Sequence, residues 1–332
     1  MKISQKIKRK AIQIAAFGLN NCHVGNFFGK GGATLYTGPW KQFCAPGLNC
    51  YSCPAASLSC PIGALQSVTG SMKMDFSFYV VGFLLAVGVL LGRFVCGFLC
   101  PFGLIQELLA KIPLPKKKWR LPRLAKYIKY GVLVVFVLLM PVVVTNVVGM
   151  GDPAFCQYIC PSGTLLGGIP LLSTHPELRQ TIGWLFSWKM FLLAVILVGS
   201  ILVYRFFCKT LCPLGAIYGI LNKVSFYRLT VDEQKCIHCG KCATVCGMDV
   251  DPVKHPQSME CIRCGECAAA CPVGAIRLGF GVFRKKTETA DAKQVTAAAA
   301  TDESLAASTE DSVAVARCTG HCTSCSLCKD HH

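Results

Sequence analysis

The sequence predicts a mainly α-helical membrane protein with about four transmembrane helices, short Cys-Pro segments at the membrane boundaries, and a small α+β module after them. Three observations predict this fold class. Apolar residues make up 53% of the 332-residue chain, and charged residues 15%, with a mean hydropathy of +0.48; soluble domains carry nearer to about 25% charged residues. Several apolar stretches are long enough to cross a bilayer. The chain also holds 23 cysteines in repeated spacings. This combination argues against an ordinary soluble enzyme, a disordered chain and a short secreted disulfide scaffold.

Each apolar stretch is judged against the width of a bilayer core, about 30 Å, which takes about 20 helical residues. Residues 76–94, 128–148 and 182–204 meet this requirement. A fourth stretch, 11–28, is interrupted by two Asn and one His, so an interfacial helix is its alternative. We therefore expect four spans.

Lys and Arg set the expected orientation of these spans. They gather at the N-terminus, in residues 111–126 and just after residue 204, whereas residues 29–75 and 149–181 hold few. Positive residues mark cytoplasmic loops. If the chain crosses the cytoplasmic membrane four times, every basic cluster lies on the same side of that membrane. The N-terminus, the soluble module and the tail are then cytoplasmic. The net charge of +17 is explained by this topology, and no basic stripe interleaved with aromatic residues indicates a nucleic-acid partner.

The soluble module, expected over residues 231–283, carries two cysteine runs with C-x2-C-x2-C-x3-C spacing. This is the pattern of bacterial ferredoxins with two [4Fe-4S] clusters, in which the fourth Cys of each run ligates the other cluster. The first cluster is therefore assigned Cys236, Cys239, Cys242 and Cys271, and the second Cys261, Cys264, Cys267 and Cys246. Zinc is the alternative ligand of C-x2-C pairs, but two full runs with glycines at matching places disfavour it. Gly247 stands where the pattern expects Pro.

The membrane part contains a repeat in which Cys-Pro-x-Gly begins a short apolar stretch. Four segments share it, and in three of them a second Cys stands four residues before the first. Pro starts a new helix, and Gly lets the backbone approach a metal closely. The two pairs expected at the cytoplasmic face complete one cluster. This inner set is Cys96, Cys100, Cys208 and Cys212. Cysteines in apolar segments can also be small buried hydrophobic residues, but three equivalent pairs favour ligation.

The outer face offers more thiols than one cluster needs. One option joins Cys156 and Cys160 to Cys60 and to either Cys50 or Cys53. Another uses Cys44, Cys50, Cys53 and Cys60 alone, and Cys22 lies nearby as a further thiol. A disulfide among the spare cysteines is an alternative if the outside is oxidising. The ligand set of the outer cluster stays open at this point.

The C-terminal region changes composition sharply. Residues 284–316 are rich in Ala, Thr, Ser and acidic residues, which indicates a flexible linker. Residues 317–332 form a cysteine-rich tail whose four thiols, Cys318, Cys322, Cys325 and Cys328, suit another Fe–S cluster or zinc. A metal-handling or storage appendage is the alternative for this tail.

With these motifs placed together, the chain resembles the NapH/NosR-type integral membrane 4Fe-4S ferredoxin (polyferredoxin) family over about residues 75–280. The resemblance rests on Arg93-x2-Cys96-x3-Cys100-Pro101, on Arg205-x2-Cys208-x3-Cys212-Pro213 and on both ferredoxin runs. It implies a membrane Fe–S protein that passes electrons between quinol or cytoplasmic donors and redox enzymes outside. The Cys156/Cys160 pair, the 44–60 segment and the tail go beyond the short family pattern. The nitrate-reductase role is therefore not transferred, and another reductase or a flavin-bearing protein could be the partner.

We predict that residues 1–230 form a transmembrane Fe–S domain that, with the ferredoxin module, carries electrons between a cytoplasmic donor or acceptor and an extracytoplasmic redox partner. At least four [4Fe-4S] clusters are expected, and five if the tail holds one. No catalytic residue is identified, which favours a non-catalytic electron-transfer subunit in a membrane complex with other redox subunits. Quinone, a cytoplasmic ferredoxin and a flavin-bearing protein are candidate partners. A quinol dehydrogenase subunit feeding an external reductase, and a metallocentre assembly or maturation factor, are the two alternatives.

Overall fold

The computed structural model describes residues 2–27, 34–71, 77–112, 122–145 and 151–281. The predicted linker and the cysteine-rich tail therefore lie outside the described residues. The α-helices are α1 (Lys2–Asn20), α2 (Pro61–Gly70), α3 (Phe78–Leu91), α4 (Phe94–Phe98), α5 (Pro101–Leu109), α6 (Arg123–Val132), α7 (Met140–Val143), α8 (Ala154–Tyr158), α9 (Pro161–Gly163), α10 (Ile169–Thr174), α11 (Trp184–Leu202), α12 (Phe206–Thr210), α13 (Pro213–Leu221), α14 (Lys241–Thr244) and α15 (Glu266–Ala270). π-Helical turns η3 (Leu133–Leu139) and η4 (Thr164–Gly168) join α6 to α7 and α9 to α10; η1 (Val24–Phe27), η2 (Pro39–Gln42) and η5 (Pro176–Thr181) are 3₁₀ turns, and the strands are β1 (Tyr227–Val231) and β2 (Ile276–Phe280).

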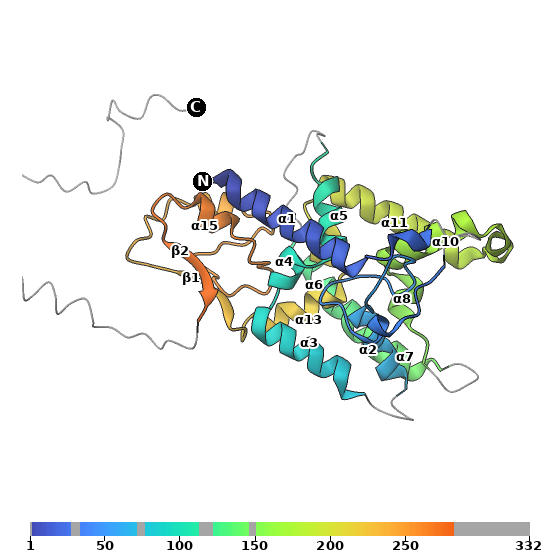
Figure 1. Ribbon diagram of the computed structural model, residues 1–332. Helices are drawn as coiled ribbons and strands as arrows, with labels where there is room; N and C mark the ends of the chain where they lie inside the picture. Colours follow the sequence, from blue (N-terminus) through green and yellow to red (C-terminus); the bar gives the residue numbers. More distant parts are fainter. Residues whose placement is uncertain (1, 28–33, 72–76, 113–121, 146–150, 282–332) are drawn as a thin grey trace, which may run out of the picture. The chain divides into compact units, whose positions relative to one another are not determined.

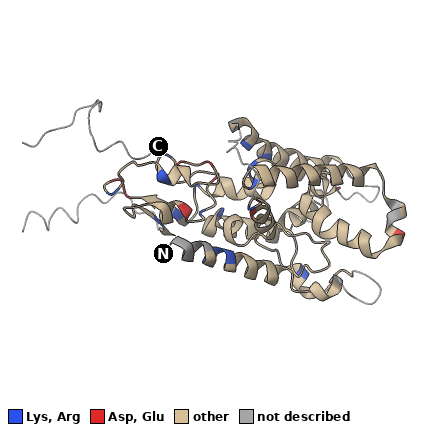
Figure 2. Cartoon of the chain, turned by 90° about the horizontal axis from the view of Figure 1, so that it is seen from above, with Lys and Arg blue, Asp and Glu red and all other residues tan. Residues whose placement is uncertain are grey.

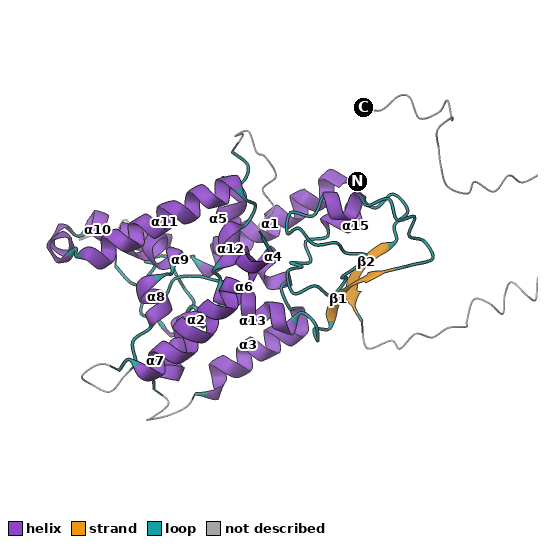
Figure 3. Cartoon of the chain, turned by 180° about the vertical axis from the view of Figure 1, so that it is seen from behind, coloured by secondary structure: helices purple, strands orange, loops and turns teal. Residues whose placement is uncertain are grey.

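The long helices lie side by side, and the small module that contains β1, β2 and α15 lies at one end of them (Figure 1). Helix α13 packs against α3 and α6, α11 packs against α5 and α12, and α1 packs against α4, α5 and α15. Helix α1 thus contacts both the other helices and the module. Figure 3 shows the same division, with both strands and the short helix α15 in the module and the long helices beside it.

Two of the predicted spans are helices long and apolar enough to cross a membrane, at residues 124–143 and 184–202. The predicted span 76–94 contains a shorter apolar helix, α3, of 14 residues. Its C-cap, Gly92, has a φ of +57°, which turns the chain into α4. Charged residues, coloured on the cartoon of Figure 2, are sparse along most of the helices.

The first predicted span is wrong in its bounds, because its helix runs over residues 2–20 instead of 11–28. The side-chain amide of Asn20 donates to the Ala16 carbonyl at 2.6 Å, and that of Asn21 donates to the Phe17 carbonyl at 3.0 Å. These local bonds compete with continuation of the helix. Among the basic side chains that the structure describes in this helix, Arg9 binds Glu107 at 3.0 Å and Lys10 binds the same carboxylate, and these pairs support the helix.

The module contains a two-stranded antiparallel sheet, and the cysteine-rich loops lie between its strands in the sequence. Its register pairs Tyr227 with Phe280 and Val231 with Ile276. Leu229 and Ile276 form a small core with the cysteine side chains of both loops. The two strands therefore join the ends of the module, and the cysteine loops lie between these ends.

Candidate iron–sulfur sites

The two ferredoxin loops have the same backbone geometry. In the first loop His238 and Gly240 have positive φ angles of 52° and 69°, and in the second Arg263 and Gly265 have 52° and 78°. A positive φ is unusual for His and Arg, and successive turns of this kind direct backbone N–H groups into a shared concavity that suits an anion. The spacing of the cysteines and the shape of the loops therefore agree with each other.

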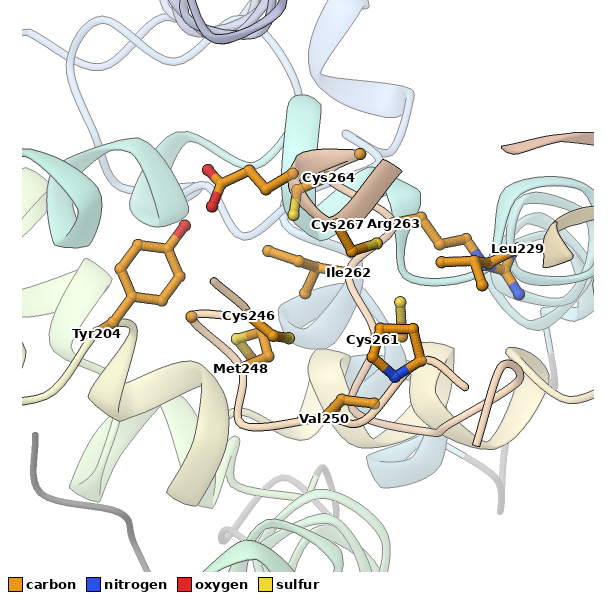
Figure 4. Close-up of a pocket in the computed structure, with 14 residues that line it drawn as sticks. Tyr204, Leu229, Cys246, Met248, Val250, Cys261, Ile262, Arg263, Cys264 and Cys267 are labelled. Atoms are coloured by element: carbon orange, nitrogen blue, oxygen red, sulfur yellow. The ribbon is translucent and has the colours of Figure 1, made fainter. Parts of the chain in front are cut away.

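The cysteines of the module gather into the two sets that the spacing predicts. One hollow is lined by Cys236, Cys239, Cys242 and Cys271, and another by Cys246, Cys261, Cys264 and Cys267. Figure 4 shows the second set, with its four thiols around the hollow and Tyr204 at its edge. Burial raises the pKa of the Cys267 thiol to about 12, so iron binding has to release its proton. Four cysteines that line one hollow fit a [4Fe-4S] cluster.

Gly247 departs from the Pro of the ferredoxin pattern because of its neighbour Tyr204. A Cβ on Gly247 would lie 2.7 Å from the Tyr204 ring, which is closer than real Cβ contacts allow. The Tyr204 hydroxyl in turn donates to Glu107 at 2.9 Å. A tyrosine from the helical part thus occupies the space that a larger residue would need.

The Cys-Pro-x-Gly motifs are helix starts. Their cysteines, listed here, are the N-cap residues of α2, α5, α9 and α13, with Pro in the first turn of each: Cys60, Cys100, Cys160 and Cys212. The N–H of Gly163 donates to the Cys160 sulfur at 3.4 Å, and that of Gly215 donates to Cys212 at 3.3 Å. The glycine amides face the thiols in the other two motifs as well. A thiolate at this position is stabilised by free backbone N–H groups and by the helix dipole.

Four buried thiols meet where α4, α5, α12 and α13 converge, and we call this group the proximal site because it lies next to the module. Its members are Cys96, Cys100, Cys208 and Cys212, each at most 8% exposed. The thiol of Cys212 interacts with those of the other three. These are the four cysteines of the predicted inner set.

Two fully buried arginines frame the proximal site with approximate two-fold symmetry. Arg93 donates to the Cys208 carbonyl at 3.4 Å, and Arg205 donates to the Cys96 carbonyl. Each guanidinium also lies against the motif glycine of one half, Arg205 beside Gly103 and Arg93 beside Gly215. Each arginine stands three residues before the first Cys of one C-x3-C-P pair and donates to the backbone of the other pair. The two arginines therefore connect the two cysteine pairs of the proximal site.

Each of these arginines has a carboxylate partner. Arg205 binds Glu107 at 2.6 Å, and Arg93 binds Glu260 at 2.8 Å. Burial alone would raise the pKa of Glu107, but Arg205, Arg9 and Lys10 together outweigh it and lower that pKa to about 2. The pKa of Glu260 is lowered in the same way: burial opposes ionisation, and Arg93 and Lys129 prevail. Both acids therefore carry a negative charge at neutral pH.

A second group of four thiols lies farther from the module, and we call it the distal site: Cys50, Cys60, Cys156 and Cys160. The Cys160 thiol interacts with the other three. A Cβ on Gly163 would lie 3.9 Å from the sulfurs of both Cys160 and Cys50, and one on Gly63 would lie 3.9 Å from that of Cys156. Of the two ligand sets left open by the sequence, the structure groups the thiols as in the first, with Cys50 as the fourth member.

Residues 44–50, which we call the strap, lie between the two sites. A Cβ on Gly47 would lie 2.6 Å from the Cα of Cys100, so the backbones are in direct contact. The backbone amide of Leu48 faces the Cys100 thiol, and that of Asn49 faces the Cys60 thiol. The buried Tyr218 hydroxyl donates to the Pro46 carbonyl at 3.0 Å. Two successive residues thus touch one cysteine of each site.

The remaining described cysteines lie outside the two groups. Cys53 faces the side-chain oxygen of Asn21 at 3.9 Å, and Cys44 lies on the strap near Cys60. Cys22 contacts Ser57 at 2.8 Å. All 19 cysteines of the described residues are free thiols, and in the same part of the chain no three His, Cys, Asp or Glu side chains surround a single-ion position. The four tail cysteines, Cys318, Cys322, Cys325 and Cys328, lie outside the described residues.

Basic side chains of the helical part attach the module. Lys209 pairs with Asp249 at 2.6 Å and Arg9 with Glu266 at 3.3 Å, while Lys129 joins Arg93 on Glu260. The sequence interpretation explained the basic residues by topology alone and missed these pairs. A backbone contact adds to them, because a Cβ on Gly97 would lie 2.6 Å from the Ile262 carbonyl oxygen. Gly97 follows a proximal-site cysteine, and Ile262 follows a module cysteine.

Comparison with protein families supports the repeat. A family model described as a 4Fe-4S binding domain matches residues 76–122, 130–175 and 184–229. Each match contains one apolar helix followed by one C-x3-C-P pair. Two other 4Fe-4S binding domain models match residues 229–250 and 258–277, within the module.

Known relatives point in the same direction. The chain is 31% identical over 205 residues to the uncharacterized protein MJ0749 of Methanocaldococcus jannaschii, which covers 59% of this chain and 68% of that protein. It is 27% identical to the methylamine utilization ferredoxin-type protein MauN of Methylorubrum extorquens (57% of this chain, 60% of that protein) and 26% identical to the ferredoxin-type protein NapH of Haemophilus influenzae (48% of each). The matches thus span about half to two thirds of these relatives. No solved structure matches the chain.

The thiol sites and the matching domains define an electron-transport protein with several [4Fe-4S] clusters, and the apolar helices support its association with a membrane. Within that class, the chain belongs to the NapH-type polyferredoxin family.

Proposed function

We propose that this chain carries electrons across the cytoplasmic membrane, between the ferredoxin module on the cytoplasmic side and a redox partner outside. When bound, a [4Fe-4S] cluster in each site accepts and releases one electron at a time. The observation that carries the proposal is the arrangement of the four-thiol sites: the proximal site lies against the module, and the strap joins it to the distal site. A core of about 30 Å is too wide for one efficient electron step, which favours two sites along the path.

The chain's own residues would supply three things to this path. The module contributes two sites, with Cys236, Cys239, Cys242 and Cys271 in one and Cys246, Cys261, Cys264 and Cys267 in the other. Arg93 and Arg205 fix the halves of the proximal site against each other and place positive charge beside its thiolates. The buried apolar residues around the strap exclude water between the sites. The basic clusters support a topology of four spans, with the N-terminus and the module in the cytoplasm.

The first experiment counts iron and acid-labile sulfide per chain after anaerobic purification in mild detergent. The full chain and a variant with all four tail cysteines changed to serine are compared. At about 4 irons per cluster, the tail variant should hold roughly 16 and the full chain about 20 if its tail binds a further cluster. A tail variant with only about 8 irons would overturn the proposal, because the helical part would then bind no cluster.

The second experiment tests the crossing itself in proteoliposomes that contain trapped ferricyanide. A membrane-impermeant reductant is added outside, so that each electron it loses reduces one ferricyanide within. Vesicles with the wild-type protein should bleach at least tenfold faster than vesicles with Cys156→Ser, which keeps the module and the proximal site. Equal rates would contradict an electron path through the distal site. Bleaching that requires added quinol would instead support the quinol dehydrogenase alternative.

A further inference from the structure

Two buried glutamines occupy equivalent positions in the proximal and distal sites. Gln66 stands six residues after Cys60, and Gln106 stands six residues after Cys100, both in the sequence Cys-Pro-x-Gly-x-x-Gln. Both side chains are 0% exposed. Each Nε2 donates to a cysteine sulfur supplied by a distant segment: Gln66 to Cys156 and Gln106 to Cys208, both at 3.2 Å.

The Gln66 Nε2 also donates to the Ile62 carbonyl at 3.2 Å, and the partner of the amide oxygen fixes the orientation of the amide. Its Oε1 accepts the backbone N–H of Phe155 at 2.9 Å, and Phe155 immediately precedes Cys156. Reversing the amide would turn its oxygen toward the sulfur and its N–H₂ toward another donor. The N–H group must therefore face the thiol.

The surroundings of the Gln106 amide indicate that its contact with the Cys208 sulfur is stabilising. Its Oε1 is buried and has no hydrogen-bond partner among the described residues, which costs free energy in a protein interior. A leucine would avoid that cost, so the buried amide needs a compensating interaction. Its Nε2 contact with Cys208 supplies one, because a hydrogen bond to an ionised group is stronger than a neutral one.

The other two Cys-Pro motifs lack a glutamine at this position. The residue six positions after Cys160 is Leu166. The residue six positions after Cys212 is Tyr218, which donates its hydroxyl to the Pro46 carbonyl at 3.0 Å. Each site thus receives one glutamine donor. In both sites the donor comes from the motif nearer the N-terminus and the accepting sulfur from the first Cys of a later C-x3-C-P pair.

We propose that Gln66 and Gln106 set the reduction potentials of the distal and proximal sites, each raising the potential at its own site by donating to one cysteine sulfur. Hydrogen bonds to the sulfurs are among the factors that tune Fe–S potentials. A donor favours the reduced state, which carries one more negative charge on the cluster and its thiolates. Because the two donors are equivalent, they raise both potentials together and limit the energy step between the sites.

This inference rests on the proposed function, and its test separates the two. The variants Gln66→Met and Gln106→Met keep the length of the side chain and remove the donor. Redox titrations followed by electron paramagnetic resonance should show one midpoint lowered in each variant, by about 59 mV, which corresponds to a tenfold change in the ratio of reduced to oxidised cluster. The lowered midpoint should be a different one in the two variants, and the double variant should lower both.

Gln13→Met is the matched control, because Gln13 is also buried but donates to the Gly97 carbonyl at 2.7 Å and, within the described part of the chain, to no sulfur. Its titration should equal that of the wild type. Iron content is measured first in every sample. Full iron content with unshifted midpoints in both glutamine variants would overturn the inference and leave the proposed function standing, whereas a wild type with about 8 irons would overturn both.

A second measurement keeps the inference testable if a methionine variant loses its cluster. In the wild-type protein exchanged into D₂O, electron–nuclear double resonance should detect exchangeable amide protons coupled to the clusters of the proximal and distal sites. Selective ¹⁵N labelling of glutamine should add a coupling assigned to Nε2. Absence of any glutamine nitrogen coupling in fully loaded protein would contradict the inference.

Discussion

Replacing Glu107 with glutamine is expected to lower the free energy of unfolding by about 3–5 kcal/mol, because it leaves a buried arginine without its counter-charge. Glu107 is 3% exposed and Arg205 is 0% exposed. Arg205 donates to Glu107 through two nitrogens at 2.6 and 3.0 Å, and Arg9 and Lys10 bind its other oxygen. A neutral amide cannot offset three positive charges. Anaerobic thermal unfolding in detergent, followed by circular dichroism, measures the effect.

The matched control for this variant is Glu177→Gln, which makes the same chemical change at an exposed position. Its unfolding temperature should stay close to that of the wild type, since surface charges contribute little. Glu107→Gln should also reduce the iron of the proximal site, because Arg205 would lose the contact that holds it against Cys96. An unfolding temperature for Glu107→Gln equal to that of the wild type would contradict this account of the buried charges.

The ion pairs of Glu107 also predict how the difference in stability between the wild type and Glu107→Gln depends on pH. The pKa of Glu107 is about 2 in the folded protein, below its ordinary value of 4.5, through Arg205, Arg9 and Lys10 acting against the effect of burial. Its contribution to stability is therefore fully present above about pH 4.5 and is lost as the pH falls toward 2. The gap between wild type and Glu107→Gln should stay constant from about pH 7 to 5 and narrow below that. A gap that widened on acidification would have the wrong sign.

The second large effect expected is a loss of about 4 irons per chain in Cys50→Ser, with no loss in Cys53→Ser. The two cysteines lie three residues apart in the same segment, so the comparison is closely matched. The Cys50 sulfur lies beside Gly163 and Gly167 in the distal site. The Cys53 thiol faces Asn21 instead. Iron and sulfide analysis of anaerobically purified protein distinguishes the two variants.

The comparison of Cys50→Ser with Cys53→Ser also predicts which cluster signal is lost. Electron paramagnetic resonance should show that Cys50→Ser loses one signal and keeps those of the module and the proximal site. Serine at Cys53 should leave every signal in place. Iron loss in Cys53→Ser with full iron in Cys50→Ser would show that the segment presents the other thiol to the distal site.

Local spacing predicted much of this molecule because its motifs combine short-range geometry with chemistry. The ferredoxin runs and the C-x3-C-P pairs predicted sets of candidate ligands, and the structure places the cysteines of each set together in the module and the proximal site. Apolar length predicted spans at 128–148 and 182–204, and the structure has apolar helices at 124–143 and 184–202. It failed for α1, because a helix rich in basic residues depends on partners far along the chain, such as Glu107 for Arg9.

Contacts between distant segments were beyond the reach of sequence patterns. The choice between Cys50 and Cys53 depends on how the 44–60 segment folds back, which neither spacing nor hydropathy specifies. Gln66 and Gln106 carried a usable signal, since both stand six residues after a motif cysteine. Their acceptor sulfurs lie 90 and 102 residues away, and only the packed structure reveals that pairing.

The strap contacts both the proximal and the distal site, and this shared contact affects the order in which clusters are inserted. Leu48 and Asn49 face one cysteine of each site, and the next residue, Cys50, belongs to the distal site. Seating the strap against Cys100 therefore positions a thiol of the neighbouring site. Cluster insertion is expected to be ordered and cooperative: a filled proximal site fixes the strap and presents Cys50, whereas an empty one leaves the distal site with three aligned thiols.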